Sequence, residues 1–191
     1  MIPRLAVASK NPDKVSEIEE ILGSVGLVDE IVRDLTWEDV EETGATLKEN
    51  ALLKARAVVE ATGLPVIADD TGLEVEALGG GPGVHTARFA GPDATYTENV
   101  EKMLAEMGGI EHRGARFRTV VALVFPDGVE MVAEGSVEGV ITTVPRGSSG
   151  FGYDPIFEVD GRTLAEMTSG EKNSLSHRAR AIRELVRSLG L

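Results

Sequence analysis

Residues 117–141 limit the possible folds of this chain more than any other segment. Residues 117–125 are rich in β-branched and apolar residues, residues 126–128 read Pro-Asp-Gly, and residues 129–141 are suited to a return strand. The pattern predicts a β-hairpin. An antiparallel pair in a chain that also carries strand–helix–strand segments requires a mixed sheet.

The first half of the chain alternates predicted strands with predicted helices. Strands are expected at residues 5–8, 30–35 and 66–68. Pro12 suits the first position of a helix, which we expect to end at Gly23. Thr46 and Glu49 form a capping box for a second helix that reaches about residue 62.

Two further helices follow. Thr95 and Glu98 form another capping box, and Gly108 is expected to close that helix. One last helix is predicted from an apolar stripe at Leu175, Ala179, Ile182, Val186 and Leu189. The order of elements predicts an α/β fold around a mixed sheet.

Composition excludes several classes of function. The 191 residues carry 19 Lys and Arg against 32 Asp and Glu, a net charge of -13 that repels nucleic acid. The absence of cysteine excludes disulfides, thiolate metal sites and a cysteine nucleophile, and favours the cytoplasm. The longest strongly apolar run, residues 120–125, is too short for a bilayer, so we expect no membrane partner.

Polar residues and glycines gather at five predicted junctions. These are residues 9–14, 42–54, 69–72, 147–154 and 172–178. At the first, the amides of a helix N-terminus together with Lys14 are suited to a phosphate. The alternative is that Asn11 only caps the helix.

Acidic residues mark the next two junctions. Glu42 lies on a loop, and Lys54 shares one helix face with Asn50. Asp69 and Asp70 follow a buried strand and should point in different directions, so we expect only one of them to meet a metal. Carboxylates suit magnesium, although an Asp-rich turn that caps local amides is the open alternative.

The last two junctions combine an aromatic residue with cations. Phe151 lies between glycines, where it is suited to stack on a base, or simply to pack. Lys172, His177 and Arg178 lie near the start of a helix, where cations are unfavourable for the helix dipole, and this indicates a ligand. The alternative for His177 is a surface histidine with local partners.

Five segments together resemble the inosine triphosphate pyrophosphatase family, also called XTP/dITP diphosphatases. In order, they are SKNPDK (9–14), EETGATLKENALLKA (41–55), ADDTGLEVEALGGGPGVHTARFAG (68–91), GSSGFGYDPIF (147–157) and EKNSLSHRARA (171–181). The resemblance covers residues 8–181. It implies a single domain over residues 1–191, with two α/β lobes around an elongated mixed sheet, a nucleotide cleft between the lobes, and a homodimer.

The resemblance also implies the roles of individual residues. Glu42 and Asp70 match the acids that bind magnesium, with one or more ions per subunit, and Asp70 matches the proton acceptor. Substrate contacts are implied for Ser9, Lys10, Asn11, Lys14, Lys54, Thr71, Phe151, Gly152, Tyr153, Asp154, Lys172, His177 and Arg178. His85 and Thr86 depart from the Tyr and Ser of the family pattern.

The activity implied is hydrolysis of ITP, dITP and XTP to the monophosphate and pyrophosphate. His177 and Arg178 would donate to the 6-oxo group that adenine lacks. Two alternatives stay open: a pyrophosphatase for modified pyrimidine or methylated nucleotides, and a non-catalytic nucleotide sensor. The pair His177 and Arg178 argues against the first, and the pair Glu42 and Asp70 argues against the second.

Overall fold

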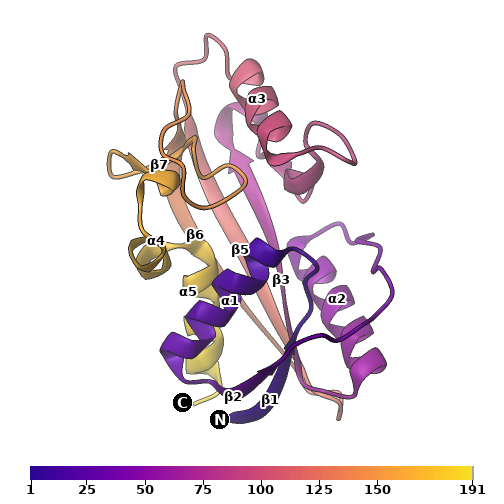
Figure 1. The fold of residues 1–191 in the computed structure, drawn as a ribbon. Helices are drawn as coiled ribbons and strands as arrows, with labels where there is room; N and C mark the ends of the chain where they lie inside the picture. The colour runs from indigo at the N-terminus through magenta and orange to yellow at the C-terminus, as the bar shows by residue number, and fades with distance from the viewer. Residues whose placement is uncertain (191) are drawn as a thin grey trace. The chain divides into compact units, whose positions relative to one another are not determined.

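The computed structural model describes residues 1–190 as an α/β protein built on one mixed sheet (Figure 1), which confirms the predicted fold class. The strands are β1 (Ile2–Val7), β2 (Val28–Val32), β3 (Val66–Val75), β4 (Gly81–Gly83), β5 (Gly114–Val124), β6 (Glu130–Ile141), β7 (Phe157–Val159) and β8 (Arg162–Thr163). Their order is β2-β1-β3-β5-β6-β7-β8, and β4 pairs with β3.

The helices connect these strands. They are α1 (Pro12–Val25), α2 (Leu47–Thr62), α3 (Tyr96–Glu106), α4 (Ser169–Leu175) and α5 (His177–Ser188), with short 3-10 helices η1 (Glu76–Leu78), η2 (Thr86–Arg88) and η3 (Leu164–Glu166). Within residues 1–190, none of the helices combines the length and the apolar composition that a bilayer span requires.

The chain divides into two compact units, each with its own core. Unit 1 contains Met1–Asp70, Thr119–Gly135 and the residues from His177 onward, and unit 2 contains Thr71–Arg118 and Ser136–Ser176. The divisions fall within β3, β5 and β6, so each of these strands contributes to both units.

Unit 1 is a parallel arrangement with helices on both faces. β1 pairs in parallel with β2 and with β3, with Leu5 opposite Ile31 and Ala6 opposite Val66. α1 packs with α5 over one face, through a core that includes Ile18 and Ile182. α2 covers the other face (Figure 1). This is the layering expected when parallel strands are joined by helical crossovers.

Unit 2 has antiparallel pairing and a separate apolar core. β4 returns along β3, and β7 pairs antiparallel with β6 and β8. Met103 of α3 and the rings of Phe117 and Phe157 are buried in its core, with the ring centroids 4.6 Å apart. The predicted hairpin is present as β5 and β6, which pass through both units. Its turn lies in unit 1, where the Phe125 amide donates a hydrogen bond to the Val129 carbonyl.

Two predicted helix boundaries are wrong. α1 runs through Gly23 and is capped by Gly26, which has a left-handed φ of 62°. The backbone N–H of Gly26 donates a hydrogen bond to the Leu22 carbonyl. The predicted last helix is two helices, because Ser176 is extended with ψ of 152°. Leu175 therefore packs in unit 2, whereas Ala179 belongs to the core of unit 1.

The prediction that a strand ends at residue 68 is also wrong. β3 loses β1 as a neighbour after Val7 pairs with Ile67, but it gains β4 from Leu73 onward. The strand therefore continues through Asp69 and Asp70, which lie in mid-strand rather than in a turn.

Candidate functional site

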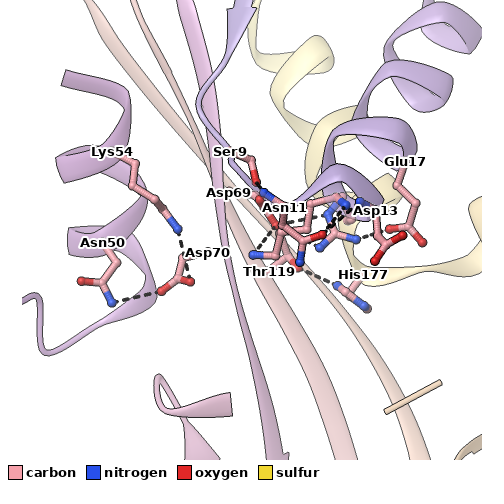
Figure 2. A network of polar contacts seen from close by, with 12 residues as sticks. Ser9, Asn11, Asp13, Glu17, Asn50, Lys54, Asp69, Asp70, Thr119 and His177 are labelled. Atoms are coloured by element: carbon pink, nitrogen blue, oxygen red, sulfur yellow. Dashed lines mark hydrogen bonds and ion pairs between the residues drawn. The ribbon is translucent and has the colours of Figure 1, made fainter. Parts of the chain in front are cut away.

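Asp69 and Asp70 project to opposite sides of β3 (Figure 2), as the pleat of a strand requires. Each carboxylate lies in a separate polar cluster of unit 1. The Asp69 cluster consists of Lys14, Glu17, Asp69 and Arg178, and the Asp70 cluster consists of Glu42, Asn50, Lys54 and Asp70. The expectation that the two side chains diverge is confirmed.

In the Asp70 cluster, two carboxylates surround one ammonium group. Lys54 Nζ donates to Glu42 Oε1 at 2.7 Å and lies 3.5 Å from Asp70 Oδ1. Asn50 Nδ2 donates to the other carboxylate oxygen, Asp70 Oδ2, at 3.1 Å. Asp70 and Asn50 are both buried.

The start of α2 brings this cluster together. Thr46 accepts from the Glu49 amide, and Glu49 closes the predicted capping box, so α2 begins where the sequence indicates. Asn50 and Lys54, one helical turn apart, then face β3 together. The prediction that they share a face is confirmed.

Burial and charge shift the pKa values of this cluster. Burial raises the pKa of Asp70, and the Glu42 carboxylate adds to the rise, against the opposing pull of Lys54 and Lys14. Burial opposes the charge of Lys54, but the carboxylates of Asp70, Asp69 and Glu42 outweigh it and raise the pKa of Lys54. Asp70 is thus a carboxylate that is costly to keep charged.

The Asp69 cluster is a buried ion-pair network. Arg178 donates to Asp69 Oδ2 through Nε at 3.1 Å and Nη2 at 3.0 Å, and its Nη1 contacts Glu17. Lys14 Nζ lies 3.5 Å from Asp69 Oδ2. Arg178 and Asp69 are 2% and 1% exposed. All three guanidinium nitrogens of Arg178 therefore contact carboxylates.

The pKa values of Asp69 and Lys14 shift downward, opposite to those of Asp70 and Lys54. Burial would raise the pKa of Asp69, but the charges of Lys14 and Arg178 hold it far below its usual range. Burial lowers the pKa of Lys14, helped by repulsion from Lys54 and Arg178. The network keeps Asp69 ionised, which is typical of a structural carboxylate.

The N-terminus of α1 has the predicted cap. Asn11 accepts from the amides of Asp13 at 3.0 Å and Lys14 at 3.3 Å, and Ser9 Oγ accepts from the Asn11 amide. Lys10 lies apart from both clusters in an exposed pair with Asp39. The structure brings Lys14 to Asp69 but leaves Lys10 at the surface.

The first residues of α5 are buried rather than at the surface. His177 is 4% exposed, and its Nδ1 lies 2.6 Å from Thr119 Oγ1. A Cβ at Gly135 would come within 2.3 Å of the His177 carbonyl, so glycine allows β6 to approach the start of α5. The unfavourable position of Arg178 near the helix start is offset by Asp69 and Glu17.

Unit 2 holds a second predicted group around Phe151. Lys172 Nζ contacts Asp154 Oδ2 at 2.5 Å and lies 4.8 Å from the Phe151 ring centroid. The Phe151 amide donates to Asp154 Oδ2 at 2.9 Å, and the ring of Tyr96 lies 5.8 Å from that of Phe151. Phe151, Asp154 and Lys172 thus form one cluster, whereas sequence reasoning did not include Tyr96.

The remaining predicted residues of unit 2 differ in exposure. Tyr153 is buried in the core, and its hydroxyl donates to the Thr86 carbonyl at 2.9 Å, so its side chain supports the fold. Thr71 follows Asp70 in β3 and is half-buried. Gly152 has φ of 62°, which a glycine adopts without strain. Substrate contacts at these positions stay predictions.

The donor set available for a metal is small. Among residues 1–190, no group of three or more His, Asp or Glu side chains could hold a metal ion. The predicted pair, Glu42 and Asp70, instead meets at the ammonium of Lys54. A metal on this pair would need further oxygen ligands from water or from substrate.

Comparisons with known proteins identify the family of the chain. The model of the Ham1 family matches residues 5–188. A dITP/XTP pyrophosphatase of Streptomyces coelicolor is 47% identical over 190 residues, covering 96% of this chain and 95% of that protein. A HAM1 protein from Coxiella burnetii has a TM-score of 0.87 at 38% identity, covering 99% of each chain.

Other solved structures are similar as well. A nucleoside-triphosphatase / dITP/XTP pyrophosphatase from Mycobacterium abscessus has a TM-score of 0.74 at 45% identity, covering 97% of this chain and 99% of that one. The family resemblance read from the five sequence segments is confirmed.

Proposed function

The chain belongs to the Ham1 family, and we propose that it hydrolyses the triphosphates of non-canonical purines (dITP, ITP and XTP) to the monophosphate and pyrophosphate. Relatives covered over nearly their whole length are dITP/XTP pyrophosphatases. The observation that carries the proposal is the Asp70 cluster, in which the buried carboxylate of Asp70 and the half-buried carboxylate of Glu42 meet at the ammonium group of Lys54.

We propose magnesium as the metal. The donor set fits it, because Mg²⁺ commonly takes one or two carboxylates from the protein and the remaining oxygens from water and substrate phosphates. Glu42 and Asp70 supply such a pair, with Lys54 holding both. When bound, Mg²⁺ would supply charge neutralisation at the phosphates and would lower the pKa of water.

In the proposed reaction, Asp70 accepts the proton of the attacking water. The water oxygen forms a bond to the α-phosphorus, the bond from that phosphorus to the bridging oxygen breaks, and pyrophosphate leaves. Burial raises the pKa of Asp70, which makes it a better base than an exposed aspartate. Lys54, Lys14 and the capped start of α1 would hold the phosphate oxygens.

For the nucleoside we propose the Phe151 cluster. Phe151 offers a ring for stacking, while Asp154 and Lys172 fix its backbone and its ring position. His177 and Arg178 are proposed base contacts by family resemblance. Because the guanidinium of Arg178 already contacts Asp69 and Glu17, its direct donation to a base would require an exchange of partners.

The remaining proposals rest on the resemblance and on composition. We propose a homodimer, as the family resemblance implies, and a cytoplasmic location, which the absence of cysteine favours. We propose no nucleic-acid partner, since the net charge of -13 repels polyanions. Light scattering coupled to gel filtration tests the dimer, and a monomer at micromolar concentration would contradict it.

Substrate selection tests the proposed function. We expect kcat/KM for dITP, ITP and XTP to exceed that for ATP, because a site built on hydrogen bonds to a 6-oxo group leaves its donors unpaired against adenine. The assay is pyrophosphate release at equal free magnesium, with dTTP and GTP in the same panel. Equal values for ITP, GTP and ATP would replace the proposal with a general nucleotide pyrophosphatase, and binding without release would indicate a sensor.

A labelling experiment tests the bond that is broken. Hydrolysis in oxygen-18 water should place the label in the monophosphate, because water attacks the α-phosphorus. Label in pyrophosphate, or orthophosphate as the first product, would contradict the proposed reaction.

A further inference from the structure

Two helices, one in each unit, begin with the same five-residue pattern. Residues 46–50 read TLKEN at the start of α2, and residues 95–99 read TYTEN at the start of α3. In both, the threonine caps the helix and the glutamate closes a capping box. The asparagine that follows, Asn50 or Asn99, is buried in both helices.

The two asparagines make the same first contact. Asn50 Oδ1 accepts from the Gly44 amide at 2.8 Å, and Asn99 Oδ1 accepts from the Ala90 amide at 2.8 Å. Each thus ties the loop that precedes its own helix to the first turn of that helix.

Their second contacts differ. Asn99 Nδ2 donates to the backbone carbonyl of Ala87 at 2.9 Å, which is a structural bond. Asn50 Nδ2 donates to the carboxylate of Asp70 at 3.1 Å. The same local device therefore holds backbone in unit 2 and an acidic side chain in unit 1.

We propose that Asn50 is a positioning residue that orients the Asp70 carboxylate; this inference rests on the proposed role of Asp70. The Gly44 amide can only donate, so it fixes Oδ1 of Asn50 on its own side and turns Nδ2 toward Asp70. Asp70 Oδ2 therefore accepts the hydrogen bond from Asn50. The other carboxylate oxygen, Oδ1, faces Lys54.

Asn50 also helps to position Glu42, because the loop that carries Glu42 packs against Asn50 at Gly44. A Cβ at Gly44 would come within 2.6 Å of Asn50 Oδ1 and 2.7 Å of Glu49 Cβ, so the loop lies directly against the helix. Glu42 is two residues before Gly44 on this loop. Asn50 therefore contacts Asp70 and anchors the segment that carries Glu42.

Outer partners of metal-binding or catalytic groups commonly affect function without touching substrate. Their loss typically lowers activity or metal affinity by about 10- to 100-fold. We expect Asn50→Ala to lower kcat for dITP by an amount in this range and to leave KM within about threefold of wild type, because the phosphate contacts remain.

Asn99→Ala is the matched control. It removes the same side chain from the same position of a capped helix, and it breaks two side-chain hydrogen bonds, as Asn50→Ala does. We expect both variants to lower the thermal midpoint, and only Asn50→Ala to lower kcat. Affinity for Mn²⁺ without nucleotide, measured by electron paramagnetic resonance, should fall only for Asn50→Ala.

Asn50→Asp provides a second variant in case Asn50→Ala does not fold. It keeps an acceptor for the Gly44 amide and replaces the donor that faces Asp70 with a carboxylate oxygen, which cannot donate to Asp70 and repels it, so kcat should again fall while the helix start remains. Equal kcat for the Asn50 and Asn99 variants, compared at the same folded fraction, would overturn the positioning role. Asp70→Asn distinguishes failure of the positioning role from failure of the proposed function, since retained turnover in that variant would overturn the proposed function itself.

Discussion

Asp69 and Asp70 are neighbours in β3 with identical side chains, yet they lie in opposite electrostatic surroundings. Asp69 contacts Arg178 and Lys14, and its pKa is lowered by these charges. Asp70 contacts Asn50 and shares Lys54 with Glu42, and its pKa is raised chiefly by burial.

Under the proposed function, β3 carries one carboxylate that stabilises the fold and, next to it, one that takes part in the reaction. On the Asp69 side, opposite charges balance, so the network stabilises the fold only while it is complete. On the Asp70 side, the acids outnumber the lysine, which is the condition under which an additional cation would bind favourably. The predictions below change one of the two sides, or a position outside both as a comparison.

The largest effect on stability is expected from Asp69→Asn. Removing one partner of a buried ion pair costs about 3–5 kcal/mol, because the other charge stays buried without compensation. Urea denaturation at neutral pH measures the loss. Asp29→Asn is the control, since the same change at this exposed position should alter the free energy of unfolding by less than about 0.5 kcal/mol.

The stability difference between wild type and Asp69→Asn should depend on pH. The pKa of Asp69 is lowered in the folded protein, so its pairing stabilises the fold above the unfolded-chain value of about 3.9. This contribution is lost as the pH falls toward the folded pKa. The stabilities of wild type and Asp69→Asn should therefore converge in acid, and a constant difference down to low pH would contradict the assignment.

Gly135→Ala is expected to have the next largest effect. The added Cβ would meet the His177 carbonyl at 2.3 Å and the Ala181 amide at 2.4 Å, and such overpacking costs about 1–3 kcal/mol. The control has the opposite sign. Gly23 lies inside α1 with nothing within 4 Å, so Gly23→Ala should stabilise the protein by about 0.5–1 kcal/mol. Equal effects at both positions would show that α5 does not need the close approach.

Lys10→Ala should have the smallest effect on the fold. Its pair with Asp39 is exposed, and such pairs contribute about 0–1 kcal/mol. KM for dITP should also rise less than in Lys14→Ala, because Lys14 lies in the buried network and Lys10 does not. A larger rise in KM for Lys10→Ala would place this exposed side chain on the substrate.

The sequence predicted helix starts well, because the interactions that cap a helix join residues close together in the chain. The capping boxes at Thr46 and Thr95 and the cap at Asn11 are present as predicted, because each depends on residues three positions apart or fewer. The end of α1 was misplaced, since Gly23 and Gly26 look alike in sequence and only Gly26 adopts positive φ.

The polar contacts between distant segments were harder to predict. Glu17 and Arg178 are 161 residues apart, and nothing in either segment indicates that they meet. The break at Ser176 was missed because the apolar spacing continues across it while its partners change from one core to another. The repeated pattern at residues 46–50 and 95–99 indicates two capped helix starts, but it does not indicate that only Asn50 contacts a carboxylate, because that contact joins residues 20 positions apart.

Asp70→Asn tests the division between the two sides of β3 most directly. Because burial makes the charge of Asp70 costly and Lys54 keeps Glu42 as a partner, the neutral amide should change the free energy of unfolding by less than about 1 kcal/mol. Loss of the base should lower kcat for dITP by about 10²- to 10⁴-fold. Turnover close to wild type, or a loss that only follows the unfolded fraction as in Asp69→Asn, would contradict the account.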